Sequence, residues 1–259
     1  MRRFLKSVVP APAWSHAKNA YNRARYNLLW KRRTIVEFNK NGHQIRLVIV
    51  DPNDLIQSEQ KRGKFYEEEE LDTIAAYFPE GGTFVDVGAN TGQHSLYFAK
   101  LKAAHVVMVE PGPEAFRLML QNIELNNIQN ECSILQVGFS DANGRADIEV
   151  HLDNLGSASI SENSRGEITT VRGDDVLIGR KIDMIKIDTE GFEIKVLAGL
   201  TETIDREQPI IYIEIDNKNL DCFHEFMRAV RYEVVYRNKR YEQNENFLIS
   251  PSSRHSKSG

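Results

Sequence analysis

The sequence predicts a doubly wound α/β domain, built on a mostly parallel sheet and preceded by an N-terminal helix and a β-hairpin. From residue 83 onward, short apolar runs alternate with segments of helical periodicity. A glycine-containing turn, "VDVGANTG", follows the first of these runs. The 259 residues, 41% of them hydrophobic, suffice for one large α/β domain. Because the strands are apolar throughout, helices should cover both faces of the sheet.

Each element of this domain follows from its local pattern. Five apolar runs predict the central strands, at 83–87, 105–110, 132–137, 182–188 and 209–215. Helical periodicity between them predicts helices at about 91–102, 113–126, 191–200 and 219–230. Two late strands, 232–236 and 246–250, should close the sheet. The less regular region 139–180 has room for short strands at 146–152 and 167–172.

The residues before this domain predict an extension. Two alternating runs around Asn41-Gly42 are typical of a β-hairpin over 34–50, and 65–78 has helical spacing. We expect the acidic run Glu67 to Glu70 to be a solvated face that also favours the helix N-terminus. The predicted organisation is therefore a basic segment, an extension, a catalytic domain and a disordered tail, at 1–33, 34–80, 81–250 and 251–259.

Charge is distributed unevenly. Residues 1–33 carry nine basic and no acidic side chains, whereas the rest carries 24 basic against 37 acidic ones, about −13. An acidic body is a poor partner for a phosphate backbone, so nucleic acid is not expected as a partner. We favour a solvated or domain-packing arm, helical over about 14–30. The alternatives are an interfacial helix giving peripheral membrane contact, and an organelle transit peptide.

The two cysteines indicate a reducing compartment. Cys132 and Cys222 lie far apart and form no CxxC motif, which argues against a disulfide framework or a zinc site. No apolar run approaches the roughly 20 residues of a membrane-spanning helix. We therefore expect a cytoplasmic location.

The glycine turn predicts a nucleoside site. Glycine allows positive φ and close approach of a ligand to the backbone, and the next helix begins with unpaired N–H groups. Asn90 replaces the second glycine of the dinucleotide pattern G-x-G-x-x-G, so a ligand without pyrophosphate fits better. Glu110, at the end of the second strand, could accept both ribose hydroxyls. We expect S-adenosylmethionine to be bound by Asp86, Gly88, Asn90, Thr91, Gly92 and Glu110.

Three longer stretches carry a family resemblance. "FVDVGANTGQHSLYFAK", "VMVEPGPEAFRLMLQNIELNN" and "IDMIKIDTEGFEIKVLAGL" resemble the FkbM family of S-adenosylmethionine-dependent methyltransferases, over about residues 66 to 215. The resemblance implies the class I methyltransferase fold and O-methylation of a hydroxyl on a sugar, glycan or secondary metabolite. The run "VRGDDVL" departs from the family's T-L-D-D-L-like pattern, although Asp174 and Asp175 suit a helix N-cap.

Catalytic candidates follow the fourth strand. Asp188 and Glu190 should reach the cleft beside the transferred methyl group, as base or as clamp for the acceptor hydroxyl. For Glu190, capping of the next helix is an equal alternative. His94 is a second base candidate or a surface histidine. Lys186, in an apolar strand, should pair with an acid such as Asp86 or Glu214.

The sequence gives weaker indications of a metal site and of a lid over the active site. Asp188 and Asp216 could hold Mg²⁺, but we favour two solvated acids and predict no metal. The Ser-, Asn- and Gly-rich segment 151–166 could be a mobile lid or a plain surface loop. Competing functions are a nucleic-acid methyltransferase, disfavoured by D-T-E-G after the fourth strand, and a non-catalytic nucleoside-binding or tethering module.

Overall fold

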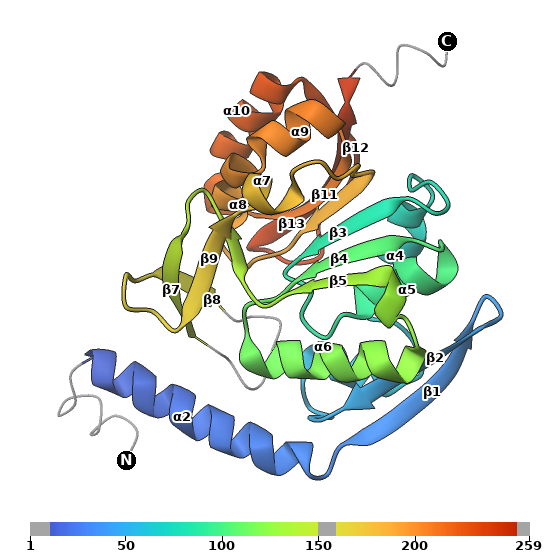
Figure 1. Ribbon diagram of the computed structural model, residues 1–259, viewed down its shortest axis with the longest axis vertical. Helices are drawn as coiled ribbons and strands as arrows, with labels where there is room; N and C mark the ends of the chain where they lie inside the picture. Colours follow the sequence, from blue (N-terminus) through green and yellow to red (C-terminus); the bar gives the residue numbers. More distant parts are fainter. Residues whose placement is uncertain (1–10, 150–158, 253–259) are drawn as a thin grey trace.

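The computed structural model describes residues 11–149 and 159–252 of the chain (Figure 1). Its centre is a seven-stranded sheet of order β12-β13-β11-β10-β3-β4-β5. The strands span β3 (Thr83–Val87), β4 (His105–Val109), β5 (Cys132–Leu135), β10 (Met184–Ile187), β11 (Ile210–Asp216), β12 (Tyr232–Asn238) and β13 (Asn244–Pro251). The strand β13 runs opposite to the other six strands of this sheet. The predicted doubly wound, mostly parallel sheet is confirmed.

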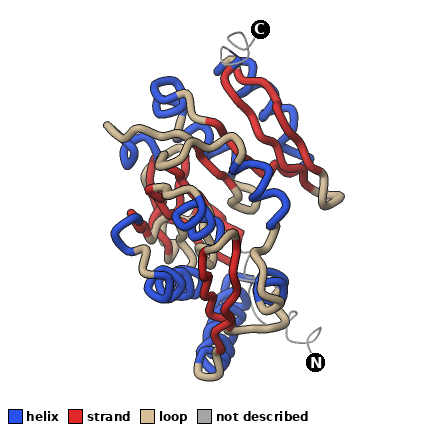
Figure 2. Tube along the Cα trace, turned by 90° about the vertical axis from the view of Figure 1, so that its right-hand side faces the viewer, coloured by secondary structure: helices blue, strands red, loops and turns tan. Residues whose placement is uncertain are grey.

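The order of the strands locates the functional edge. The chain lays down β3, β4 and β5 in one direction and then returns to place β10 on the other side of β3. In such sheets ligands bind at this reversal, beyond the carboxyl ends of the strands. The strands β12 and β5 form the two edges of the sheet. Figure 2 shows the long strand pair next to the C-terminus at one side of the molecule.

Helices cover both faces of the sheet. One face packs against α4 (Glu68–Ala75), α5 (Gln93–Leu101) and α6 (Pro113–Asn126). The other packs against α7 (Gly173–Leu177), α8 (Glu193–Gly199), α9 (Thr201–Glu207) and α10 (Leu220–Val230). Alternation along β3 divides the side chains between the two layers. Phe84 stacks on Phe98 of α5 with ring centroids 4.0 Å apart, while Val85 joins the other core.

The extension packs against the main domain. It consists of α2 (Ala11–Trp30) and the hairpin β1 (Thr34–Lys40) and β2 (His43–Ile49), whose turn has positive φ at Asn41 and Gly42. Tyr26 and Trp30 are buried, and the Arg117 guanidinium lies 3.8 Å from the Trp30 ring centroid. In the described part of α2 the packing interpretation is confirmed, and contact of its outer face with a membrane stays a prediction.

The irregular region 139–180 forms a second sheet. It contains β6 (Gly138–Ser140), β7 (Gly144–Glu149), β8 (Ser159–Glu162) and β9 (Ile168–Arg172), in the order β6-β9-β7-β8. Much of the predicted lid 151–166 lies outside the described residues, and its part at 159–162 is a strand rather than a loop.

Sequence patterns missed two short helices. In α3 (Leu55–Gln60) the Asp54 carboxylate accepts from the Gln57 N–H at 2.9 Å and caps the helix. The first turn of α9 is capped by a residue distant in sequence, because the Asp174 carboxylate accepts from the Thr203 N–H at 2.7 Å. The expectation that Asp174 and Asp175 suit a helix N-cap is confirmed in part: Asp174 caps the distant helix α9, whereas the N-cap of α7, the helix that contains both residues, is Arg172.

The remaining ordered pieces are small. Within residues 11–149 and 159–252 there are two 3₁₀ helices, η1 (Gln129–Glu131) and η3 (Asn217–Asn219). Pro251 ends β13 instead of starting the predicted tail, whose residues 253–259 lie outside the described part of the chain. None of the helices in the described ranges is both long and apolar enough to cross a bilayer.

Candidate active site

A cavity of about 280 Å³ opens where the strand order reverses. Its wall on the β4 side is largely apolar and includes Val109, Pro111, Val137, Phe139 and Ile148. Its wall on the β10 and β11 side is polar and acidic and includes Lys186, Asp188, Thr189, Glu190 and Glu214. One cavity therefore offers an apolar slot beside a group of ionisable side chains.

The glycine turn is shaped by the protein's own packing. Gly88 and Gly92 have φ of 82° and 74°, conformations that L side chains rarely adopt. A Cβ on Gly88 would lie 1.8 Å from the Asp188 carbonyl oxygen, and one on Gly92 would lie 2.7 Å from Met108 and from Met119. Gly88 lines the cavity and Gly92 does not. Both glycines thus make room for neighbouring protein atoms, whereas we expected room for a ligand.

Glu110 is fixed at the end of β4. Its Oε2 accepts from the Asn90 N–H at 2.8 Å and its Oε1 from the Gly112 N–H at 2.6 Å. Burial raises its pKa to about 7, although these two hydrogen bonds oppose the rise. Asn90 and Glu110 line the cavity together, and the buried Asn90 Oδ1 has no hydrogen-bond partner in the described structure.

Thr91 and Asp86 lie behind the surface of the cavity. Thr91 lines it but is 1% exposed, and its Oγ1 accepts from Gln60 at 3.2 Å. Asp86 is fully buried and is not part of the lining. Its Oδ2 accepts from the Ser95 hydroxyl at 2.8 Å. Asp86 therefore supports the turn from below.

Lys186 joins Asp86 to the predicted catalytic residue. It is in register with Asp86 on the adjacent strand, and its Nζ lies 3.5 Å from Asp86 Oδ1 and 3.2 Å from Asp188 Oδ2. The pair with Asp86 is confirmed. The ammonium is 4% exposed, and nearby carboxylates, Asp188 first, outweigh the effect of burial and raise its pKa. Lys186 therefore stays charged and orients the Asp188 carboxylate.

Three carboxylates gather above the strand ends. Oxygens of Asp188, Glu190 and Glu214 all lie within 4.8 Å of one another. Burial and the neighbouring carboxylates, Asp188 foremost, raise the pKa of Glu190 to about 8 and that of Glu214 to about 9. Such a group shares protons near neutral pH.

The sequence left two other roles open for the acids near the ends of β10 and β11, namely a helix cap by Glu190 and a metal site that includes Asp216. The Gly191 N–H at the start of the next helix donates to Glu193, so Glu190 does not cap that helix. Asp216 pairs with Lys218 at 2.6 Å. Among the described residues, the acids whose oxygens lie close enough together to hold a metal ion are Asp188, Glu190 and Glu214, and Asp216 is not one of them.

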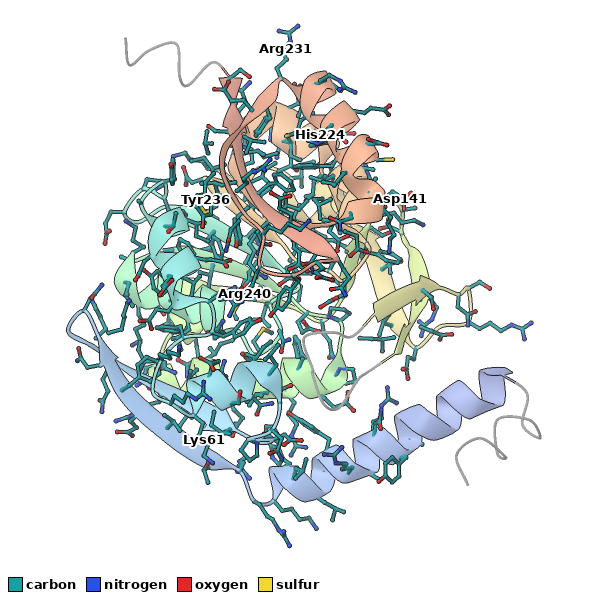
Figure 3. All side chains as sticks on the ribbon, turned by 180° about the vertical axis from the view of Figure 1, so that it is seen from behind. Lys61, Asp141, His224, Arg231, Tyr236 and Arg240 are labelled. Carbon is teal, nitrogen blue, oxygen red and sulfur yellow. The ribbon has the colours of Figure 1, made fainter. Side chains whose placement is uncertain are left out.

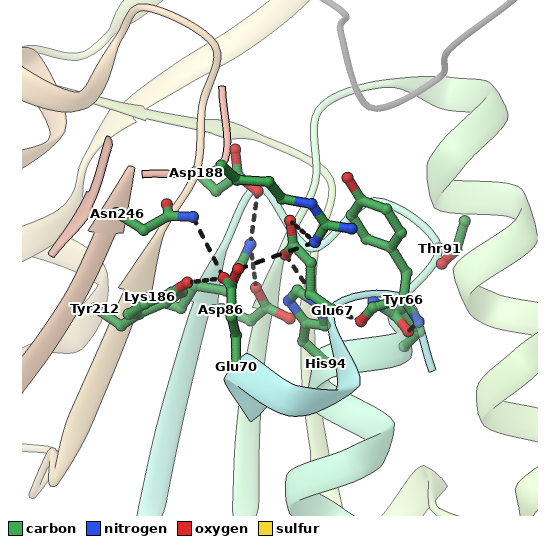
Figure 4. Close-up of polar contacts among 12 residues, drawn as sticks. Tyr66, Glu67, Glu70, Asp86, Thr91, His94, Lys186, Asp188, Tyr212 and Asn246 are labelled. Carbon is green, nitrogen blue, oxygen red and sulfur yellow. Dashed lines mark hydrogen bonds and ion pairs between the residues drawn. The ribbon is translucent and has the colours of Figure 1, made fainter. Parts of the chain in front are cut away.

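The segment before α4 supplies residues that sequence reasoning missed. Glu67 has φ of 58° and its side chain is 10% exposed. Burial, with Glu70 and Asp188 nearby, raises its pKa to about 7. Glu70 accepts from the Tyr212 hydroxyl and from Asn246. The expectation of a solvated acidic run is therefore wrong for Glu67 and Glu70 (Figure 4).

His94 faces the same segment. It lines the cavity, is only 7% exposed, and its Nε2 lies 3.4 Å from the Tyr66 carbonyl oxygen. Burial and Lys186 lower its pKa to about 3, so the imidazole is neutral at physiological pH. The surface alternative for His94 is wrong.

A latch joins this segment to the loop between β12 and β13. The Tyr66 and Tyr241 hydroxyls are 2.9 Å apart, and both residues line the cavity. Arg240 lies 5.0 Å from the Tyr66 ring centroid and 3.4 Å from the Glu67 carboxylate. In Figure 3, which views the molecule from behind, Arg240 lies near the middle of the face toward the viewer.

The chain is similar in sequence to known methyltransferases. The chain is 23% identical over 168 residues to the hexuronic acid methyltransferase AglP of Haloferax volcanii, covering 63% of this chain and 67% of that one. It is 26% identical over 164 residues to methyltransferase sdnD of Sordaria araneosa, covering 49% and 63%. The chain thus spans about two thirds of the length of these relatives.

The solved methyltransferase FkbM of Methylobacillus flagellatus is also similar, at 19% identity and a TM-score of 0.48, covering 66% of this chain and 44% of that one. The family assignment rests on a broader match. Residues 86–241, more than half of the chain, match the family model described as the methyltransferase FkbM domain. The match includes the glycine turn, Glu110 and the acids after β10. The chain therefore belongs to the FkbM family of S-adenosylmethionine-dependent methyltransferases, with the class I fold that the sequence predicts.

Proposed function

We propose that the whole protein transfers a methyl group from S-adenosylmethionine to a hydroxyl of a sugar, a glycan or a hydroxylated secondary metabolite. The observation that carries this proposal is the arrangement of the cavity, in which Glu110 on one side faces the same space as Asp188 on the other. The relative named as a hexuronic acid methyltransferase supports a sugar-type acceptor. When bound, S-adenosylmethionine supplies an electrophilic methyl group on a positively charged sulfur.

The residues present fit this cofactor. The Glu110 carboxylate uses one lone pair of each oxygen on the Asn90 and Gly112 N–H groups, which leaves acceptor capacity for two ribose hydroxyls. The unpartnered Asn90 Oδ1 offers a further acceptor. Val109, Val137 and Phe139 form an apolar slot that suits an adenine ring. We assign Gly88 and Thr91 to the wall around the cofactor, and Asp86 and Gly92 to its support.

Asp188 and Glu190 have different roles toward the acceptor hydroxyl. Asp188 is oriented by Lys186 at 3.2 Å, so its free oxygen can accept from the acceptor hydroxyl and hold it in line with the methyl group. Glu190 has a pKa of about 8, near the operating pH, which is the best range for a general base. We therefore assign the clamp to Asp188 and proton acceptance to Glu190, within the group that includes Glu214.

Transfer of a radiolabelled methyl group to a panel of hydroxylated acceptors tests this assignment. Asp188→Asn should lower kcat at least about 100-fold, because the clamp loses its charge and positioning alone contributes several kcal/mol. Asp205→Asn, on the exposed side of α9, is the matched control and should leave kcat unchanged. Unchanged turnover in Asp188→Asn, or an absence of transfer to every hydroxylated acceptor, would count against the proposal.

A further inference from the structure

We infer that the acceptor is uncharged around its reacting hydroxyl, as in a neutral sugar, and that the site selects against anionic acceptors such as uronic acids and sugar phosphates. This inference rests on the proposed function and adds the charge class of the acceptor. By this inference, the acceptor of this chain differs in charge from the acid for which its relative, the hexuronic acid methyltransferase AglP, is named.

The carboxylates around the cavity would repel an anion. Five of them line it: Glu67, Glu110, Asp188, Glu190 and Glu214. Three have oxygens within 4.8 Å of one another on the side that we assign to the acceptor. An added negative charge there would meet the Asp188 carboxylate and the negative charge that Glu190 and Glu214 retain while they share protons. The space is partly desolvated, so like charges repel strongly in it.

The cations near the cavity are already paired. Lys186, the one Lys or Arg among the described lining residues, contacts Asp86 and Asp188. Arg240 lies over the Tyr66 and Tyr241 rings and contacts Glu67 at 3.4 Å and Glu70 at 3.9 Å. His94 is buried and neutral. Recognition of a carboxylate or phosphate usually uses Arg or Lys donors, and here each is engaged by acids.

The same wall suits a neutral polyol. Carboxylates are strong acceptors for sugar hydroxyls, and a carboxyl group that carries a proton donates as well. Asn244 adds an amide, which donates to Glu214 at 2.7 Å. Tyr66 and Tyr241 add aromatic surface with a polar edge. An uncharged, hydroxyl-rich ring can therefore form hydrogen bonds with this wall and pack against its aromatic side chains, whereas the carboxylates would repel an anionic ring.

Binding of matched sugar pairs to the full-length protein tests the inference. The protein is first saturated with S-adenosylhomocysteine, whose binding is measured by calorimetry. Saturation-transfer NMR then compares methyl β-glucopyranoside with methyl β-glucuronide, and methyl β-galactopyranoside with methyl β-galacturonide. We expect each neutral sugar to bind at least about tenfold more tightly than its uronide.

Two variants link the result to the named carboxylates. Glu190→Gln/Glu214→Gln should reduce the preference for the neutral sugar at least threefold, whereas the exposed Glu124→Gln on α6 should not change it. A thermal melt checks that each variant is folded. A uronide that binds as tightly as its neutral partner, or the failure of both forms to bind, overturns the inference while the measured cofactor binding still stands. Failure of S-adenosylhomocysteine itself to bind overturns the proposed function, and the inference with it.

Discussion

At the residue scale, Gly88 lies against the end of β10, and its φ of 82° is only part of its constraint. A methyl group there would overlap the Asp188 carbonyl oxygen at 1.8 Å. Because Asp188 is the proposed clamp, the absence of one Cβ directly after β3 sets how closely the end of β10 approaches the glycine turn. The backbone contact between Gly88 and Asp188 thus links the packing of β3 against β10 to the position of the proposed clamp.

Gly88→Ala should therefore cost several kcal/mol of unfolding free energy, because β3 and β10 must separate. Gly179→Ala is the matched control: its φ is 71°, with nothing within 4 Å of the added Cβ. It should cost only the roughly 1–2 kcal/mol of a left-handed alanine. Denaturant unfolding of both variants gives the comparison, and equal losses would show that the close approach is unimportant.

Single residues also show what sequence could predict about the site. Glu110 stands next to a strand end, and strand ends of one parallel sheet share an edge, so its place was predictable. Asp188 follows by the same rule. Glu67 and Arg240 belong to a turn and a loop far apart in sequence, and only the tertiary structure joins them at 3.4 Å. No periodicity in the sequence marks that contact.

At the element scale, α2 stabilises the molecule through two aromatic side chains of one face. Tyr26 is 2% and Trp30 7% exposed, whereas Leu28 is 65% exposed. Between them, Asn27 accepts from Arg117 at 3.3 Å, and Arg117 also covers Trp30. The helix is thus attached by packing and cation–π contact, as the favoured interpretation of its sequence expected, although its composition also allowed a membrane-facing arm.

Trp30→Ala should lower the free energy of unfolding by about 3 kcal/mol, because a large buried ring is lost. Leu28→Ala on the exposed face should change it by less than about 0.5 kcal/mol. Urea titrations at one pH provide the measurement. If the two variants behaved alike, the described packing of α2 would be contradicted.

Elements differed in how well their patterns predicted them. The helix α6 (Pro113–Asn126) begins at a proline and matches its predicted bounds, and β3 matches as well. The short helix α9 was missed because its first N–H groups are satisfied by Asp174, 29 residues earlier. The strands β6 to β9 were only partly anticipated, since pairing between distant short strands leaves little trace in local sequence.

At the scale of the whole molecule, charge is concentrated in the cavity and should make stability depend on pH. The pKa values of Glu67, Glu110, Glu190 and Glu214 are raised from 4.5 to about 7, 7, 8 and 9. Above pH 4.5 the folded state therefore holds more protons than the unfolded state. Its stability is lost as pH rises through these values. The pKa of His94 is lowered from 6.5 to about 3, so this residue makes stability increase with pH between about 3 and 6.5 and has no further effect above pH 6.5.

The ligand-free protein should therefore lose stability between about pH 6.5 and pH 9. A positively charged ligand relieves the repulsion among the carboxylates, so S-adenosylmethionine should raise the Tm more at pH 9 than at pH 6.5. Thermal melts at both pH values, with and without ligand, measure this. The Glu190→Gln/Glu214→Gln variant should flatten the dependence. A Tm that rises over this range in the ligand-free protein is the contrary result.

The most direct test of the account is a calorimetric titration of the full chain with S-adenosylmethionine, repeated on Glu110→Gln and on the exposed control Glu124→Gln. We expect saturable binding to the unaltered protein and to the control, and at least about tenfold weaker binding when one acceptor oxygen of Glu110 becomes a donor. No binding by the unaltered protein, or the same affinity in Glu110→Gln, would contradict it.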